Sequence, residues 1–162
     1  MRVLILMTQS RQIAGLIAWL IFTFSATATA LFVKTDGWYA QIQKPSWNPP
    51  SWIFGPVWTT LYIMMAIAAW LVWKRGGFAA QRVPLGLFFL QWILNALWTP
   101  LFFGLHNPAL AFADIVALVL CLAATIVSFQ KVHPPAAYLL LPYLAWVSFA
   151  AFLNFTIWRL NA

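Results

Sequence analysis

The segment Ala109–Phe129, ALAFADIVALVLCLAATIVSF, decides the fold class of this protein. Asp114 is its one charged residue, and a helix of about 20 apolar residues crosses a hydrocarbon core of about 30 Å. The whole chain has the same character, because 64% of its 162 residues are hydrophobic and 7% are charged. A soluble domain carries about 25% charged residues. We therefore expect an all-α integral membrane protein.

Apolar runs of similar length lie on both sides of this segment. Together they give five expected spans, at residues 13–33, 52–73, 83–105, 109–129 and 136–158. The connections after the second, third and fourth spans are short, which predicts an up-and-down bundle in sequence order. The first connection, residues 34–51, is longer. The spans occupy most of the chain, so we expect residues 1–162 to form a single domain.

The first span ends in Ala26–Ala30, ATATA, which is similar to the small-residue cleavage site of a signal peptide. Its apolar run is longer than the 7–15 residues typical of a signal core. Small residues also let another helix approach closely. We keep this helix in the mature protein.

The net charge is +7, but the cations stand singly or in pairs at the ends of apolar runs. This pattern excludes a nucleic-acid-binding stripe and indicates membrane topology instead. With five spans, the N-terminal side carries Arg2, Arg11, Lys74, Arg75, Arg82 and Lys131, and the other side carries Lys34, Lys44 and Arg159. The excess predicts a cytoplasmic N-terminus.

Residues suited to catalysis are scarce. The two acids, Asp36 and Asp114, lie on different segments, and His106 and His133 fall in loops on opposite faces of the expected bundle. No metal site, carboxylate pair or activated nucleophile can be assembled from them. Asp114 has two interpretations: an intramembrane carboxylate of functional importance, or, as we favour, a group that caps its helix or interacts with the helix dipole.

Three spans each carry an aromatic and polar face at helical spacing. These faces are Trp58 and Tyr62 in the second span, Gln91, Asn95 and Trp98 in the third, and Pro142, Trp146, Ala150 and Asn154 in the fifth. Buried amides are costly in a bilayer unless they are paired, so the amides should point into the bundle. Either they only join the helices, or they help to line a cavity for a small molecule.

Three separate stretches closely resemble the TspO family of tryptophan-rich sensory proteins, which is similar to the mitochondrial translocator protein or peripheral benzodiazepine receptor. They are KPSWNPPSWIFGPVWTTLY at 44–62, LNALWTPLFFG at 94–104 and PYLAWVSFAAFLNFTIWRLN at 142–161. The resemblance implies a five-helix bundle, usually a homodimer, that serves as a receptor or carrier for porphyrins and other hydrophobic molecules. Protoporphyrin IX or haem is then a ligand, and no cofactor is required. The resemblance to bacterial members also leads us to expect the bacterial cytoplasmic membrane, with the outer membrane as the alternative.

The resemblance also implies which residues line the ligand pocket. They are Trp58, Tyr62, Asn95, Trp98, Trp146, Ala150 and Leu153. We also expect the ligand to contact Trp38 and Trp47. Both belong to the first connection, where Pro45, Pro49 and Pro50 stiffen the chain. We interpret this connection as a lid that covers the cavity. Lys34 and Lys44 are candidates to meet the propionates of a porphyrin.

Two further functions remain open. Bacterial members of the family are reported to degrade protoporphyrin in light, and the resemblance assigns this photochemistry to Trp58 and Trp146. The third alternative is a structural or partner-binding membrane protein in which the aromatic faces only pack. Small residues for a dimer contact are Ala26 and Ala30 in the first span, or Gly86 and Ala96 in the third.

Recognition of sterol-like lipids is less well supported. The family's sterol motif has a tyrosine near the end of the last helix, where this sequence has Phe155, although the basic residue is retained as Arg159. Such motifs are weak even when complete.

Overall fold

A computed structural model describes residues 8–31, 33 and 37–162 of the protein. Five stretches of it are long and apolar enough to cross a membrane: Gln9–Ala30, Ser51–Trp73, Arg82–Gly104, Pro108–Val132 and Pro134–Leu160. They confirm that there are five spans, and each observed bound lies within about four residues of the expected one. No strand occurs among the described residues. The protein is therefore an all-helical, multi-pass membrane protein.

Several spans are built from more than one helical element. The elements are α1 (Gln9–Phe24), η1 (Ser25–Thr27), α2 (Ala28–Leu31), α3 (Gly37–Gln41), α4 (Ser51–Trp73), α5 (Gly77–Ala80), α6 (Arg82–Thr99), η2 (Pro100–Gly104), α7 (Pro108–Val132), α8 (Pro134–Leu139) and α9 (Leu141–Leu160). The first span consists of α1, η1 and α2, the third of α6 and η2, and the fifth of α8 and α9. Here η1 is a 3₁₀-helix and η2 is a π-helix.

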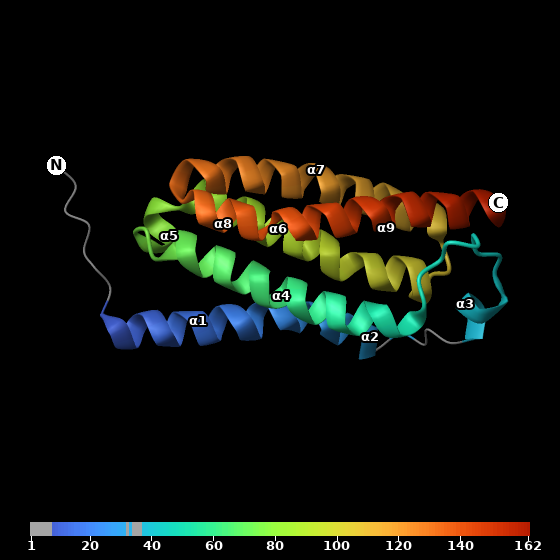
Figure 1. Ribbon diagram of the computed structural model, residues 1–162, viewed down its shortest axis with the longest axis horizontal. Helices are drawn as coiled ribbons and strands as arrows, with labels where there is room; N and C mark the ends of the chain where they lie inside the picture. Colours follow the sequence, from blue (N-terminus) through green and yellow to red (C-terminus); the bar gives the residue numbers. More distant parts are fainter. Residues whose placement is uncertain (1–7, 32, 34–36) are drawn as a thin grey trace.

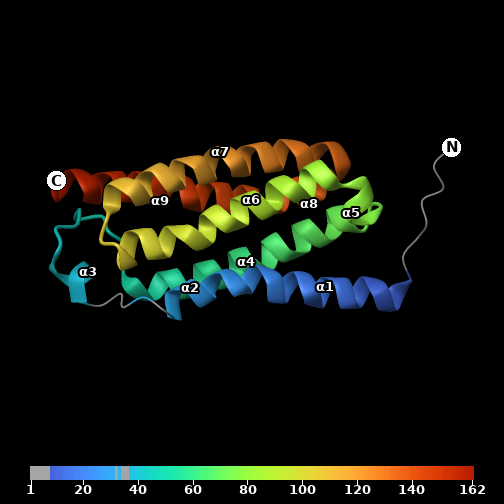
Figure 2. The same ribbon diagram turned by 180° about the vertical axis from the view of Figure 1, so that it is seen from behind.

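The spans run up and down as expected, but their order around the bundle differs from their order in the sequence (Figures 1 and 2). α4 packs between α1 and α8, α7 packs between α6 and α9, and η1 and α2 lie against α6. The consecutive helices α4 and α6 share a smaller contact. Fully buried alanines, such as Ala66 and Ala69 in α4 and Ala136 and Ala137 in α8, allow the fifth span to approach α4 closely.

The start of α1 and the end of α9 lie at opposite ends of the bundle (Figure 1), and we call these the N-terminal and C-terminal ends. α5 lies at the N-terminal end, and α3 lies at the end that carries the C-terminus. Lys74 and Arg75 therefore share the N-terminal end with His133, whose pKa is lowered by burial and by these two cations. This arrangement agrees with the grouping of cations expected from the sequence, except that Arg2 and Lys34 lie outside the described residues. The side of the membrane that each end faces stays a prediction.

The start of α7 corrects the favoured interpretation of Asp114. Pro108 occupies the first helical turn, and the side chain of Asn107 accepts a hydrogen bond from the backbone N–H of Leu110 at 3.0 Å. Asn107 is therefore the N-cap. Asp114 lies in the second turn, beyond the first turn in which a carboxylate interacts with the helix dipole.

Residues 37–50 of the first connection are held by contacts with the bundle. Trp38 stacks on His106 with 4.7 Å between ring centroids, and Trp47 stacks on Phe152 at 5.2 Å. The side-chain amide of Asn161 binds the backbone N–H and C=O of Gln43, both at 2.9 Å. The expected packing of this segment is present, and α3 is a short helix that the proline argument did not predict.

Candidate ligand-binding cavity

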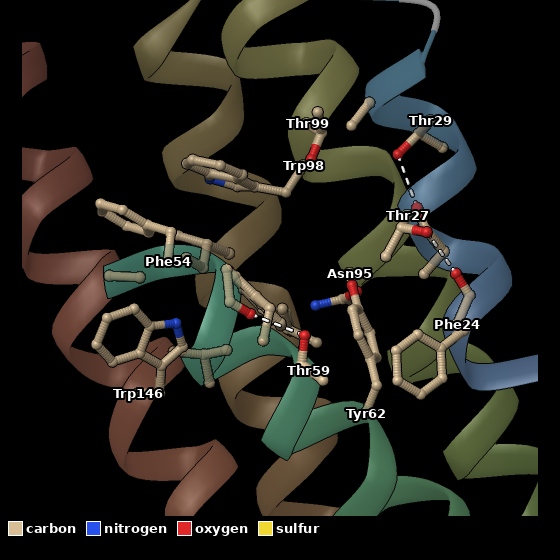
Figure 3. Close-up of a pocket in the computed structure, with 18 residues that line it drawn as sticks. Phe24, Thr27, Thr29, Phe54, Thr59, Tyr62, Asn95, Trp98, Thr99 and Trp146 are labelled. Atoms are coloured by element: carbon tan, nitrogen blue, oxygen red, sulfur yellow. Dashed lines mark hydrogen bonds between the residues drawn. The ribbon is translucent and has the colours of Figure 1, made fainter. Parts of the chain in front are cut away.

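A cavity of about 370 Å³ lies inside the bundle, toward the end where α3 packs. Its volume falls within the range of about 300–1,000 Å³ that is usual for small-molecule pockets. Eighteen residues line it (Figure 3). They are Phe24, Ala26, Thr27, Thr29, Ala30, Phe54, Gly55, Trp58, Thr59, Tyr62, Asn95, Trp98, Thr99, Ile115, Leu118, Trp146, Val147 and Ala150. All five spans contribute to the wall.

Aromatic rings form much of this wall. Trp58 and Tyr62 are one turn apart on α4 and stack with 5.4 Å between centroids. Phe24 meets Tyr62 at 5.5 Å, and Phe54 presents an edge to Trp146 at 5.8 Å. These contacts fix the orientation of the rings, so the wall offers preformed flat surfaces to a ligand.

The side-chain amide of Asn95 is a hydrogen-bonding group on the cavity wall. The hydroxyl of Tyr62 donates to Oδ1 of Asn95 at 3.0 Å. This bond fixes the amide so that its nitrogen points into the cavity (Figure 3). None of the described lining residues is charged. The cavity therefore suits an apolar, aromatic molecule that carries a hydrogen-bond acceptor.

The structure brings together most of the residues that were expected to line the pocket. Trp58, Tyr62, Asn95, Trp98, Trp146 and Ala150 all lie on the cavity wall, from three different spans. Their spacing on α4, α6 and α9 explains this, because each set occupies one helix face and these faces turn toward the same interior.

Three expected site residues lie elsewhere. Trp38 and Leu153 belong to a separate apolar cluster around Phe102. The ring of Trp47 packs against Phe152 on α9, and 41% of the surface of Trp47 is exposed. Within residues 37–50, the first connection contributes no residue to the cavity wall. It covers the ends of η2 and α9, which is a narrower role than that of a lid over the whole cavity.

Of the two lysines considered for porphyrin propionates, the structure describes Lys44. The ammonium of Lys44 donates to the backbone carbonyls of Tyr39 and Ile42 at 2.6 and 3.0 Å. It stabilises the connection itself. The other candidate, Lys34, lies outside the described residues.

The buried amides divide into two kinds. Gln91, Asn95 and Asn154 are all buried, as expected. Asn154 accepts from the indole N–H of Trp98 at 2.9 Å and donates to the carbonyl of Pro108 at 2.7 Å. Asn154 therefore joins α9 to α6 and α7, whereas Asn95 faces the cavity. Both of the alternatives left open by the sequence occur in one molecule.

Sequence reasoning missed the contribution of the first span. Ala26, Thr27, Thr29 and Ala30 all lie on the wall. The ATATA stretch that they belong to was interpreted as a close-packing or cleavage signal. Small and hydroxyl residues at the end of a span were the available signal, because they leave space beside a helix that bulky residues would fill.

The described part of the chain contains no cluster of three or more metal-ligating side chains of the His, Cys, Asp or Glu type. Cys121, the single cysteine, lies in α7 and donates weakly to the carbonyl of Leu87 at 3.6 Å.

Comparison with known proteins agrees with this architecture. Residues 6–159 match the TspO/MBR family. The human translocator protein is 48% identical over 134 residues, which cover 80% of this chain and 79% of that protein. A tryptophan-rich protein TspO from Archaeoglobus fulgidus is 44% identical over 153 residues, covering 94% and 97%. A tryptophan-rich sensory protein from Cereibacter sphaeroides is 39% identical over 149 residues, covering 88% and 92%. The chain is an integral membrane protein that belongs to the TspO/MBR family, and this membership supports a membrane receptor role.

Proposed function

We propose that this protein is a receptor or carrier for flat, hydrophobic ligands of the tetrapyrrole class, such as protoporphyrin IX or haem. The observation that supports this proposal is the wall formed by Trp58, Tyr62, Trp98 and Trp146 around the inward-pointing amide of Asn95. Related hydrophobic aromatic molecules fit the same surfaces. A regulatory or stress-response role follows from the same binding.

Stacking on the rings is the main source of affinity in this proposal. An aromatic pair contributes about 0.5–1.5 kcal/mol beyond the burial of its area. Trp58 is held by contacts with Tyr62 and Tyr143, and Trp146 by contacts with Phe54 and Phe149. Such rings are already ordered, so little conformational entropy is lost when a macrocycle binds.

The lining residues also restrict the position of charged groups. Because none of the described lining side chains is charged, the ionised propionates of a porphyrin gain no ion pair inside the cavity. Leaving them in the apolar interior would carry a large desolvation cost. The macrocycle should therefore occupy the cavity with its propionates directed toward water.

A dark titration of the purified protein with protoporphyrin IX tests this proposal. The porphyrin absorption band serves as the readout, so that substitution of tryptophan does not remove the signal. We expect saturable binding, and we expect Trp58→Phe/Trp146→Phe to weaken it about tenfold, which corresponds to about 1.4 kcal/mol.

The matched control is Trp52→Phe, also on α4 but 74% exposed and absent from the cavity wall. It should bind like the wild type. Binding that fails to saturate, or that is insensitive to the double substitution, would contradict the proposed site. It would favour the alternative that the aromatic faces only pack.

A second candidate function is light- and oxygen-dependent degradation of the bound porphyrin. The stack of Trp58 on Tyr62 places two oxidisable rings at the cavity wall. An excited porphyrin could take an electron from Trp58 or transfer energy to oxygen. Illumination of protein and of empty detergent under identical conditions tests this, since equal rates of porphyrin loss would refute it.

We also propose a homodimer in the bacterial cytoplasmic membrane. Among the small residues considered for the contact, Ala26 is buried within the protomer and Ala30 lines the cavity, whereas Gly86 on α6 is exposed to open space. The exposed side chains of Leu90, Ile93 and Leu97 continue this face of α6. The α6 face is therefore the better candidate, and cross-linking in native membranes tests it.

A further inference from the structure

The first span leaves α4 partway along its length. Near the middle of the bundle, the hydroxyl of Thr23 donates to the backbone carbonyl of Tyr62 at 3.1 Å, which ties α1 to α4. Beyond that point, η1 and α2 lie against α6 instead. The first span and the first half of α4 are therefore separated at the end of the bundle that holds the cavity.

Hydroxyl side chains account for this change of direction. Ser25, Thr27 and Thr29 each donate to the carbonyl three residues earlier, at 2.6, 2.7 and 2.9 Å. Such bonds compete with the regular helical ladder and bend helices. They coincide with η1, where the α-helix tightens into a 3₁₀ turn.

The cavity reaches the surface in the separation between these elements. Among the described lining residues, four are exposed: Thr27 and Ala30 on the first span, and Gly55 and Thr59 on α4. We call these four residues the mouth. All of them lie within membrane-spanning stretches. The mouth therefore faces the lipid rather than bulk water.

The depth of the mouth follows from helix geometry. Ala30 is the last residue of the first spanning stretch, and α4 begins at Ser51. At 1.5 Å per residue, Gly55 lies about 6 Å and Thr59 about 12 Å along α4 from its start. The mouth thus extends from the headgroup boundary into the hydrocarbon.

The rim of the mouth is suited to contact with hydrocarbon. The hydroxyl of Thr59 donates to the carbonyl of Gly55 at 2.9 Å, and the hydroxyl of Thr27 is bonded within its own helix. No hydroxyl proton is left unpaired on the rim, so its exposure to lipid costs little. A Cβ atom on Gly55 would meet nothing within 4 Å. Gly55 therefore leaves the mouth open at its position on α4.

We infer that ligands enter and leave the cavity sideways from the bilayer, through the mouth between η1–α2 and α4. This inference rests on the proposed binding function. The inference narrows the ligand class to molecules that dissolve in the membrane. During entry, the ionised groups of such a molecule stay at the headgroup level while its apolar ring passes Gly55 and Thr59.

The test compares two adjacent threonines in lipid nanodiscs. Thr59 and Thr60 are both exposed on α4, and both donate to the carbonyl four residues earlier at 2.9 Å, but only Thr59 lines the cavity. Stopped-flow mixing with protoporphyrin IX in the dark gives the association and dissociation rates. We expect Thr59→Phe to slow both the association rate and the dissociation rate about tenfold, because the bulkier side chain narrows the mouth that the ligand must pass in each direction. Thr60→Phe should behave like the wild type.

Two further variants complete the design. Gly55→Leu narrows the mouth from a second position and should also slow both rates. Trp38→Ala removes the stack on His106 and so loosens the first connection. We expect unchanged association and dissociation rates, because the ligand uses the mouth. Ligands that passed beneath the first connection would instead exchange faster in this variant. Thermal melts confirm that each variant folds.

The possible results distinguish failure of entry through the mouth from failure of the proposed binding function. Saturable binding with wild-type rates in Thr59→Phe and Gly55→Leu would overturn entry through the mouth. Faster exchange in Trp38→Ala would place the route beneath the first connection instead. Absence of saturable binding in the wild type would refute the proposed function itself.

Discussion

Two buried amides show how differently residues of one type act within a membrane bundle. Asn154 is hydrogen-bonded to both Trp98 and Pro108. Neither side-chain polar atom of Gln91 has a hydrogen-bond partner among the described residues. A buried polar group without a partner costs about 1–3 kcal/mol, whereas a paired one is close to neutral or favourable. The two positions should therefore respond oppositely to an apolar substitution.

We predict that Asn154→Leu lowers the free energy of unfolding by about 1–2 kcal/mol, because it leaves the indole N–H of Trp98 and the carbonyl of Pro108 unpaired. Gln91→Leu, the matched control on α6, should be neutral or stabilising. Thermal melts of both variants in the same detergent check this. A larger loss of melting temperature for Gln91→Leu than for Asn154→Leu would contradict it.

At the scale of elements, the contact between α1 and α4 depends on a position without a side chain. Gly15 on α1 is buried against the ring of Trp73 on α4, and a Cβ atom there would overlap the ring, lying 2.8 Å from its Cη2 atom. The indole N–H of Trp70 donates to the carbonyl of Gln12 at 2.8 Å on the same side. Close approach of the two helices makes this bond possible.

We predict that Gly15→Ala destabilises the protein by about 1–3 kcal/mol, the usual cost of forcing extra volume into a packed contact. Gly55→Ala is the control, because its added methyl group meets open space and alanine favours the helix. Unfolding in a denaturing detergent series compares the two. Equal stability of the two variants would show that Trp73 moves aside without cost.

Element boundaries also show where local sequence is informative. Long apolar runs located the spans, and the Asn107-Pro108 pair begins α7 as a cap and a first-turn proline do. The breaks at η1 and η2 were not predicted. Hydroxyl residues such as Ser25 and Thr27 also occur in regular helices, so their presence in the sequence does not by itself locate the tighter turn that their bonds to the backbone accompany.

For the whole molecule, the distribution of cations predicts an orientation in the membrane. α5 and the first connection lie at opposite ends of the bundle. Ala79 in α5 and Ser46 in the first connection are both exposed, so each can report on its own end. The excess of Lys and Arg predicts that the end that carries α5 faces the cytoplasm.

We predict that a membrane-impermeant maleimide labels Ser46→Cys in intact spheroplasts, and labels Ala79→Cys only after permeabilisation. Both variants carry Cys121→Ala, which removes the single native thiol. The opposite labelling pattern would reverse the proposed orientation without affecting the fold.

The sequence by itself determined the number of spans and the faces of Trp58, Tyr62, Asn95, Trp98 and Trp146 that point inward. These features depend on local composition and on the helical repeat, which each segment carries independently of its neighbours. Apolar length alone commits a segment to the bilayer, and spacing of three or four residues puts its side chains on one face.

Only the tertiary structure decided which faces meet. It placed the fifth span rather than the third beside α4, assigned Asn154 to packing and Asn95 to the cavity, and moved Trp38, Trp47 and Leu153 away from the wall. These outcomes depend on how closely particular helices approach, which is set by small residues and hydrogen bonds between segments distant in the sequence. The mouth arises in the same way, because it is a separation between two spans rather than a property of either one.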